Sequence, residues 1–492
     1  MTATLPSELW LCIFSYLDLE DLRNARQVCK TWSELINCDL LWKPRLLARG
    51  VSLDCMKLDD GEHEHEEGVS NRWVQLGLTY YGNLASNWGN LNFEFSTFPR
   101  STAGVAMQMP FVVWTFKPSD ANFVEVLRVV NGEMAKEARL PLPIRGAFYT
   151  DDSCSPCMTF NNVFAVTMNV TIIIFKLKDG KFSFAKAIEF TGSGSCFSTK
   201  DTEVTPRYIF EWNESRTLPM CSSFCVTDDV IWFQAIRIEE GEPYRRTMYV
   251  WNYNTSTLLL NVEVRNFIGS SKDYAFLMTK DEGFSIYSLN GNKIWSEASE
   301  VTSVCWNNFG CAFIEIGGYP SVKAKFLELP KATSTKNIDV PHAVAITLHK
   351  TGHFAFCLRL EDNTARMNCI SLRNGGILWD IVAFPIPTPS PVFSTLFCYK
   401  LDVVLGKYIT LLGMDDSLMV GEWNKLHVYT TSRGKKLGTI NIKPLYELQH
   451  LSDEFMLAGT SEHNGDWEFR YELYNFLFGK DTPDEPIEAM EP

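Results

Sequence analysis

Two histidines in the acidic stretch GEHEHEE have a spacing that suits metal binding. His63 and His65 alternate, so an extended strand would place both imidazoles on one face. A metal site normally needs three or four convergent ligands, and an acidic segment collects such residues by composition alone. We therefore expect neither a metal site nor another cofactor in this chain.

Two further motifs resemble fragments of catalytic sites. Cys154 and Cys157 have the two-residue spacing of redox and zinc motifs, but no second pair follows, and reduced thiols in a loop are the simpler interpretation. The stretch GSGS at 192–195 begins like a phosphate-binding loop, yet Phe197 replaces the third glycine of the dinucleotide fingerprint. There is no Gly-x-Ser-x-Gly motif and no recognisable triad, so we predict no catalytic residues.

Adjacent arginines provide a candidate recognition site. Arg245 and Arg246 stand in GEPYRRTMYVW, just before a predicted strand. Arginine binds carboxylates and phosphates bidentately, so the pair could contact a target protein. The alternative is an ordinary hairpin with salt bridges.

Length and composition indicate a globular protein with more than one domain. The chain has 492 residues, of which 46% are hydrophobic. Its 14 cysteines are scattered and no signal peptide precedes them, which is typical of reduced thiols in the cytoplasm or nucleus. No apolar run reaches the length of a membrane span, so we expect no membrane partner.

The negative charge is concentrated in two short segments. Of the net charge of −14, residues 51–70 carry −6 and residues 481–492 carry −5. Residues 54–70 are a predicted solvated linker, and residues 481–492 are a predicted disordered acidic tail. The remaining chain is nearly neutral and has no basic face, which argues against nucleic-acid binding.

The first 50 residues have helical periodicity. Leu5, Leu9, Ile13 and Leu17 recur every fourth residue and form an apolar stripe. Further apolar spacings predict two more helices, one carrying Leu22, Ala25 and Val28 and one carrying Trp32, Leu35, Ile36 and Leu40. Three helices in so short a segment bury little surface, so we expect a partner to cover the stripe.

This segment, residues 1–50, resembles the F-box family. The shared pattern is LP, a hydrophobic helix, VC-x-x-W and then LW. The resemblance implies that the segment docks on a Skp-type adaptor and, through it, on a cullin-RING ubiquitin ligase. The residues that it assigns to the adaptor are Leu5, Pro6, Leu9, Ile13, Phe14, Leu17, Leu22, Val28, Trp32 and Trp42. The alternative is that they only pack the small helical bundle.

Residues 51–90 are predicted to comprise the acidic linker and a connector helix. Trp73, Leu76 and Tyr80 have helical spacing, and Asn87-Trp88 precedes the first strand-like segment. This order resembles the connector of F-box proteins with WD-repeat domains, although the basic residues of that family around Asn-Trp are missing.

Residues 91–480 are predicted to be all-β. Strand pairs around tight turns recur about every 50 residues, as in IIIFKLKDGKFSFAKAI, FSIYSLNGNKIW and NCISLRNGGILW, with glycines in most turns. This period is typical of propeller blades, each hairpin being the outer pair of a blade, and predicts seven or eight blades. WD signatures are fragmentary, the best being Trp379-Asp380. A pair of β-sandwiches is the alternative.

The overall expectation is a small all-α F-box of three helices followed by a large β-propeller. The resemblance implies a non-catalytic substrate receptor of an SCF-type ubiquitin ligase, in which the propeller binds a target protein. The alternative is a propeller enzyme or ligand sensor whose F-box regulates its own turnover.

Overall fold

The computed structural model describes residues 5–17, 19–49, 51, 71–98, 102–116, 123–130, 133–142, 155–158, 163–168, 171–190, 196–199, 216–238, 245–316, 322–329, 335–338, 340–361, 364–385, 397–415, 425–442, 445–463 and 467–477. The acidic linker and the acidic tail predicted above lie outside these residues.

Helices occupy the N-terminal part of the described chain. They are α1 (Ser7–Phe14), α2 (Leu19–Ala25), α3 (Lys30–Ile36), α4 (Asp39–Ala48) and α5 (Arg72–Asn90). The predicted F-box thus contains four helices, not three, because the chain leaves helical geometry at Asn37 (ψ 45°) and Cys38 (ψ 122°). Periodicity missed this break because apolar residues continue on both sides of it. The helix α5 is the predicted connector.

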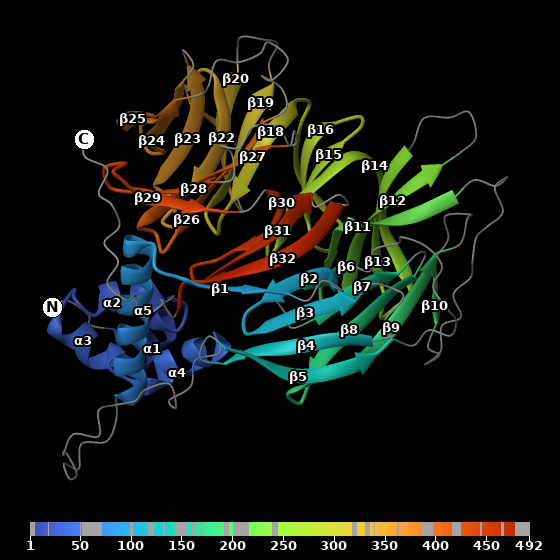
Figure 1. Cartoon of the computed structure of the whole chain (residues 1–492), viewed down its shortest axis with the longest axis horizontal. Helices are drawn as coiled ribbons and strands as arrows, with labels where there is room; N and C mark the ends of the chain where they lie inside the picture. Colours follow the sequence, from blue (N-terminus) through green and yellow to red (C-terminus); the bar gives the residue numbers. More distant parts are fainter. Residues whose placement is uncertain are drawn as a thin grey trace.

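The remaining described chain is all-β, as predicted, and its 32 strands form seven antiparallel sheets (Figure 1). The first three sheets in chain order contain β2 (Thr102–Gln108), β3 (Phe111–Phe116), β4 (Phe123–Val130) and β5 (Glu133–Pro141); β6 (Ser155–Met158), β7 (Val163–Met168), β8 (Thr171–Lys178), β9 (Lys181–Phe190) and β10 (Cys196–Thr199); and β11 (Arg216–Val226), β12 (Val230–Ile238), β13 (Arg245–Asn252), β14 (Thr257–Ser270), β15 (Tyr274–Thr279), β16 (Gly283–Ser288) and β17 (Lys293–Glu297).

The other four sheets contain four strands each. They are β18 (Glu300–Trp306), β19 (Gly310–Ile316), β20 (Val322–Glu328) and β21 (Thr335–Ile338); β22 (Ala343–Leu348), β23 (Phe354–Glu361), β24 (Thr364–Ser371) and β25 (Ile377–Pro385); β26 (Phe397–Val404), β27 (Tyr408–Asp415), β28 (Lys425–Thr430) and β29 (Lys436–Asn441); and β30 (Leu445–Leu451), β31 (Phe455–His463), β32 (Trp467–Asn475) and β1 (Glu94–Thr97).

Two features of the pairing matter for the architecture. The long strand β14 pairs with β13 through its first half, up to Glu263, and with β15 through its second half, from Val264. The seven-stranded sheet therefore consists of two four-stranded units that share one continuous strand. At the other end of the chain, β1 pairs with β32, so an early strand completes the last sheet.

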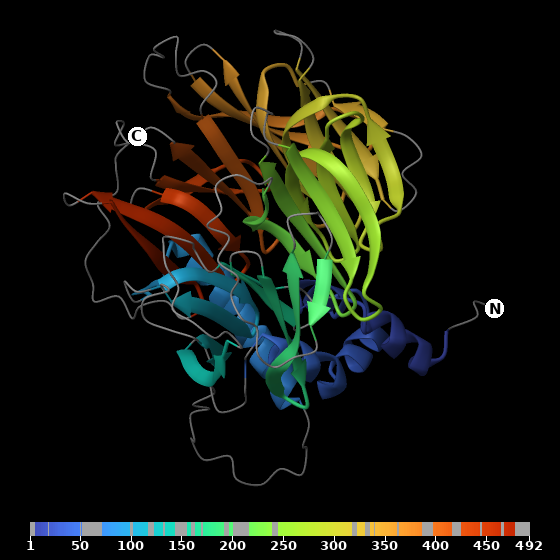
Figure 2. The ribbon, with the colours of Figure 1, turned by 90° about the vertical axis from the view of Figure 1, so that its right-hand side faces the viewer.

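Figure 2 shows the sheets arranged one after another around the β body. Neighbouring sheets share hydrophobic clusters. The last sheet also packs on the first, because Val105 of β2 lies in one cluster with Leu457 of β31 and Leu473 of β32. Each sheet thus buries both faces against its neighbours, which is the packing of a β-propeller. A pair of sandwiches would bury only one face of each sheet.

The hairpins found in the sequence are the third and fourth strands of their units, as predicted. Examples are β8 with β9, β16 with β17 and β24 with β25. Their turns contain residues with positive φ, including Gly180 (77°), Gly291 (85°) and Gly375 (73°). In the predicted turn without glycine, Ser256 takes this conformation (58°).

Candidate functional site

An apolar face of α1 and the turn after it is open to solvent. Leu5, Leu9 and Ile13 are 44%, 49% and 44% exposed, and Tyr16 is 85% exposed. These positions share one side of the helix because residues three and four apart are neighbours. Phe14 points the other way and is 1% exposed. The helix therefore presents one apolar face to the core and another to solvent.

An aromatic cluster holds α1 on the rest of the bundle. Trp10 stacks on Phe14 with ring centroids 5.6 Å apart, and Trp32 of α3 contacts both rings, at 4.9 Å and 5.2 Å. Arg45 of α4 donates hydrogen bonds to the backbone oxygens of Leu17 at 2.7 Å and Phe14 at 3.1 Å. Arg45 thus ties α4 to the carbonyls at and just after the C-terminal end of α1.

Trp42 joins the F-box to the connector helix. It is fully buried, and its Nε1 donates to the Ile36 carbonyl at 2.9 Å. Gly77 of α5 lies directly against its indole, since a Cβ at this glycine would come within 2.2 Å of Trp42 Cε3. Any larger residue at position 77 would push α5 away from the bundle.

The Asn87-Trp88 pair of the connector helix α5 contacts the last sheet. Trp88 is fully buried and stacks on Phe476 with centroids 3.7 Å apart, and its Nε1 donates to the Asp453 carbonyl at 2.7 Å. Asn87 Nδ2 donates to the Phe476 carbonyl at 2.9 Å. This dipeptide, noticed in the sequence, is therefore a structural contact between helix and propeller.

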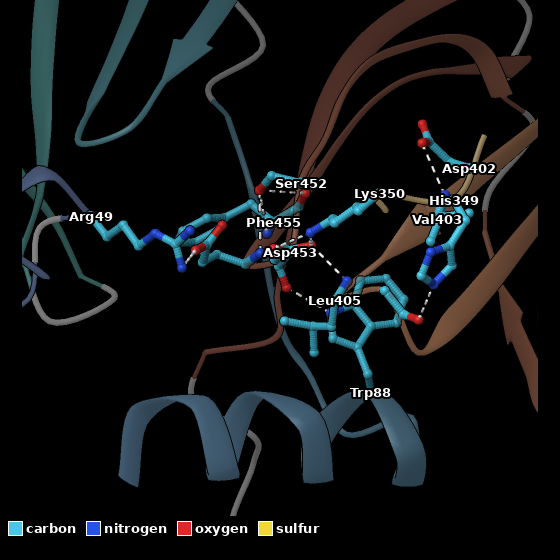
Figure 3. Close-up of polar contacts among 12 residues, drawn as sticks. Arg49, Trp88, His349, Lys350, Asp402, Val403, Leu405, Ser452, Asp453 and Phe455 are labelled. Carbon is cyan, nitrogen blue, oxygen red and sulfur yellow. Dashed lines mark hydrogen bonds and ion pairs between the residues drawn. The ribbon is translucent and has the colours of Figure 1, made fainter. Parts of the chain in front are cut away.

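A polar network surrounds this contact (Figure 3). Lys350 Nζ lies 2.7 Å from both carboxylate oxygens of Asp453, and the Leu405 amide donates to the same carboxylate at 2.8 Å. On the helical side, Arg49 forms an ion pair with Glu454 at 3.3 Å. Burial favours the protonated form of Asp453, but the charge and hydrogen bond of Lys350, with the Leu405 amide, outweigh it and lower the pKa.

His349 extends the network to the neighbouring turn. The Thr351 amide donates to its Nδ1 at 3.2 Å, so Nε2 carries the proton that is donated to the Gly406 carbonyl at 2.8 Å. Burial lowers the pKa of His349, which favours this neutral tautomer. Sequence reasoning missed Lys350, Asp453 and His349, because their partners lie up to 103 residues away.

The structure divides the residues that the resemblance assigned to the adaptor into three groups. Five are exposed, two are half-buried and three are buried. The exposed ones are Leu5, Pro6, Leu9, Ile13 and Val28, the half-buried ones are Leu17 and Trp32, and the buried ones are Phe14, Leu22 and Trp42. A partner can contact the exposed residues directly. The buried residues pack in the core and support the helices that carry the exposed ones.

The arginine pair lies elsewhere. Arg245 and Arg246 begin β13, and Arg245 Nη1 is 3.8 Å from Glu263 Oε1, while Arg246 Nη1 donates to the Arg265 carbonyl at 3.1 Å. These contacts fit the salt-bridged hairpin that was the alternative reading. The start of a third strand also lies at the sheet edge opposite the first-to-second-strand turns, and those turns contact the helices through Asp453 and Glu454.

Other sequence candidates add nothing to this site. His63, His65, Cys154 and Gly192 lie outside the described residues. Within the described ranges, no three His, Cys, Asp or Glu side chains are grouped so as to hold a metal ion, and no helix is long and apolar enough to cross a membrane.

Comparison with known proteins agrees with the sequence resemblance. Residues 2–47 match the F-box-like family, and the chain therefore carries an F-box-like domain at its N-terminus. It is 47% identical over 86 residues to F-box/LRR-repeat protein 5 of Salmo salar and 34% identical over 86 residues to human F-box only protein 48. Each match covers 17% of this chain, and they cover only 12% and 52% of those relatives.

The solved structures to which the chain is similar include a propeller. The Dos1 propeller matches with a TM-score of 0.39 at 9% identity, covering 78% of this chain and 94% of that one. Hsv2 of Kluyveromyces lactis matches with a TM-score of 0.35 at 9% identity, covering 64% of this chain and 95% of that one.

F-box proteins are in general substrate-recognition subunits of SCF ubiquitin ligases and bind Skp1.

Proposed function

We propose that this chain is the substrate-recognition subunit of an SCF-type ubiquitin ligase. Its F-box docks on the Skp-type adaptor, and a propeller of eight four-stranded blades binds the target protein. The chain itself is not an enzyme; it raises the effective concentration of the target near a ubiquitin-loaded enzyme. The observation that carries this proposal is the exposed face of Leu5, Leu9 and Ile13 on a domain of F-box type.

The target site belongs to the propeller face that points away from the helices. The helices contact the first-to-second-strand turns, at Asp453 and Tyr408, and the start of each third strand lies at the opposite edge of its sheet. Connections between strands carry binding residues on a rigid scaffold. Arg245 and Arg246 lie on that side and remain the first residues to test for target binding.

The first prediction tests the adaptor face. The double variant Leu9→Asp, Ile13→Asp should abolish binding of the purified Skp-type adaptor, because two charges buried in an apolar interface cost several kcal/mol. Both residues are about half exposed in the free chain, so the fold should persist. Phe14, at 1% exposure, is unsuitable because a charge there would disrupt the bundle.

Surface plasmon resonance measures the affinity of the purified adaptor for the unmodified chain and for the double variant. Val382→Asp is the matched control, since Val382 is 54% exposed on the outer strand β25. Unchanged adaptor affinity in the double variant would refute the proposed docking face.

A further inference from the structure

Four turns of the propeller share one local structure. Each joins the first and second strands of a unit, and the first residue accepts hydrogen bonds from the amides two and three positions later. The turns are Thr227–Val230, Ser271–Tyr274, Asn307–Gly310 and Ser452–Phe455, with amide-to-side-chain distances of 2.8 to 3.4 Å. These are Asx and ST turns, which recur with the blades.

One of the four turns has a different type of residue at its third position. It is Asp229, Asp273 and Glu454 in three turns, but Phe309 in the fourth. Turn geometry therefore does not require an aromatic side chain there, and an acidic residue is compatible with it. Phe309 is nevertheless 51% exposed, so about half of this apolar residue faces solvent.

Phe309 faces a cavity between the F-box and the propeller. The cavity has a volume of about 1130 Å³, and its walls include Tyr16 and Leu17 on the helical side and Phe309 and Gly352 on the propeller side. The backbone of Gly352 supports the Phe309 ring, since a Cβ at this glycine would lie 2.7 Å from Phe309 Cγ. The propeller wall is thus a fixed part of the fold.

The helical wall continues the apolar face of α1. Tyr16 follows Leu9 and Ile13 at helical spacing, and its amide still bonds to the Ile13 carbonyl at 3.1 Å. A partner seated on Leu9 and Ile13 therefore reaches Tyr16 next and, across the cavity, Phe309.

We infer that the adaptor-binding surface extends beyond the F-box, through Tyr16 and the cavity, onto the propeller turn of Phe309. This inference rests on the proposed adaptor docking. The occupant is a segment of the adaptor that fills the gap between the two walls and covers both aromatic side chains. Charged residues of both signs line the same cavity, among them Glu20, Glu328, Lys336 and Arg373, so the adaptor segment is recognised by its apolar contacts with Tyr16 and Phe309 and not by net charge.

The test is the adaptor affinity of the full-length variant Phe309→Asp. Three sister turns carry Asp or Glu at this position, so the variant should fold, which its thermal midpoint checks. We expect adaptor binding to weaken about tenfold, whereas Phe309→Leu, which keeps an apolar side chain, should weaken it less than threefold. Val382→Asp should leave the affinity unchanged.

The result also separates this inference from the proposed function. If Leu9→Asp, Ile13→Asp abolishes binding but Phe309→Asp binds like the unmodified chain, the adaptor contacts only the F-box and the inference is wrong. If neither variant affects binding, the proposed docking itself fails. A drop in affinity for Phe309→Asp with an unchanged thermal midpoint supports the inference.

Discussion

The ion pair of Lys350 and Asp453 should weaken at low pH. The folded chain lowers the pKa of Asp453, so the pair stabilises the fold above the ordinary aspartate value of about 3.9 and ceases to do so as pH falls through the lowered value. Lys350→Met removes the charge that outweighs burial. The carboxylate of Asp453 would then remain buried without its main cation.

We predict that Lys350→Met lowers the free energy of unfolding at pH 7 by about 1 to 2 kcal/mol, less than for a fully buried pair because the Lys350 side chain is 37% exposed and solvent screens its charge. The loss should be smaller at pH 3 than at pH 7, because burial without Lys350 favours the protonated form of Asp453 and acid supplies that proton. Urea unfolding at both pH values measures it. An equal loss of stability at the two pH values would show that the packing of the lysine side chain, and not its charge, is responsible.

Sequence reasoning found part of the site at this scale. Spacing identified the apolar stripe and the F-box motif, but it could not tell which motif residues face solvent, because Ile13 and Phe14 are neighbours on opposite sides of one helix. Lys350 and Asp453 carry no sequence signal, since only the closed propeller brings them together. Phe309 stands out only when its turn is compared with the three turns of the same structure, which carry an acidic residue at that position.

At the scale of elements, the contact between α5 and the last sheet fixes the position of the helices on the propeller. Trp88 supplies both the stack on Phe476 and the hydrogen bond to Asp453. We predict that Trp88→Ala costs about 3 to 5 kcal/mol of stability, as for other buried aromatic deletions. Trp88→Phe keeps an aromatic ring and loses the N–H donor, so it should cost about 1 to 2 kcal/mol.

Urea unfolding followed by circular dichroism gives both values. Equal costs for the two variants would assign the attachment to the hydrogen bond rather than to the stack.

Element prediction from the sequence was better for strands than for helices. Glycines that need positive φ marked the hairpins, and the positions 180, 291 and 375 are turns in the structure. The break at Asn37 and Cys38 escaped detection because Ile36 and Leu41 are both buried and continue the apolar spacing. The strand β14 was not recognised as shared, because nothing in its sequence marks the change of partner at Val264.

At the scale of the whole molecule, the F-box and the propeller share one hydrophobic core. This cluster contains Phe14 and Trp42 of the F-box, Leu84 of α5, and Leu412 and Met456 of the propeller. Separating the chain at residue 70 would expose this core on both fragments. Point variants on the surface therefore distinguish the two binding functions better than fragments do.

The central claim is that one face of the chain binds the adaptor while another binds the target. The most direct measurement compares the unmodified full-length chain with Leu9→Asp, Ile13→Asp in cells, by quantitative affinity purification with the proteasome inhibited. We predict that the variant loses the adaptor and the cullin but retains the other captured proteins, which carry less ubiquitin than those bound to the unmodified chain. Retention of the adaptor, or loss of the captured proteins together with it, would contradict the account.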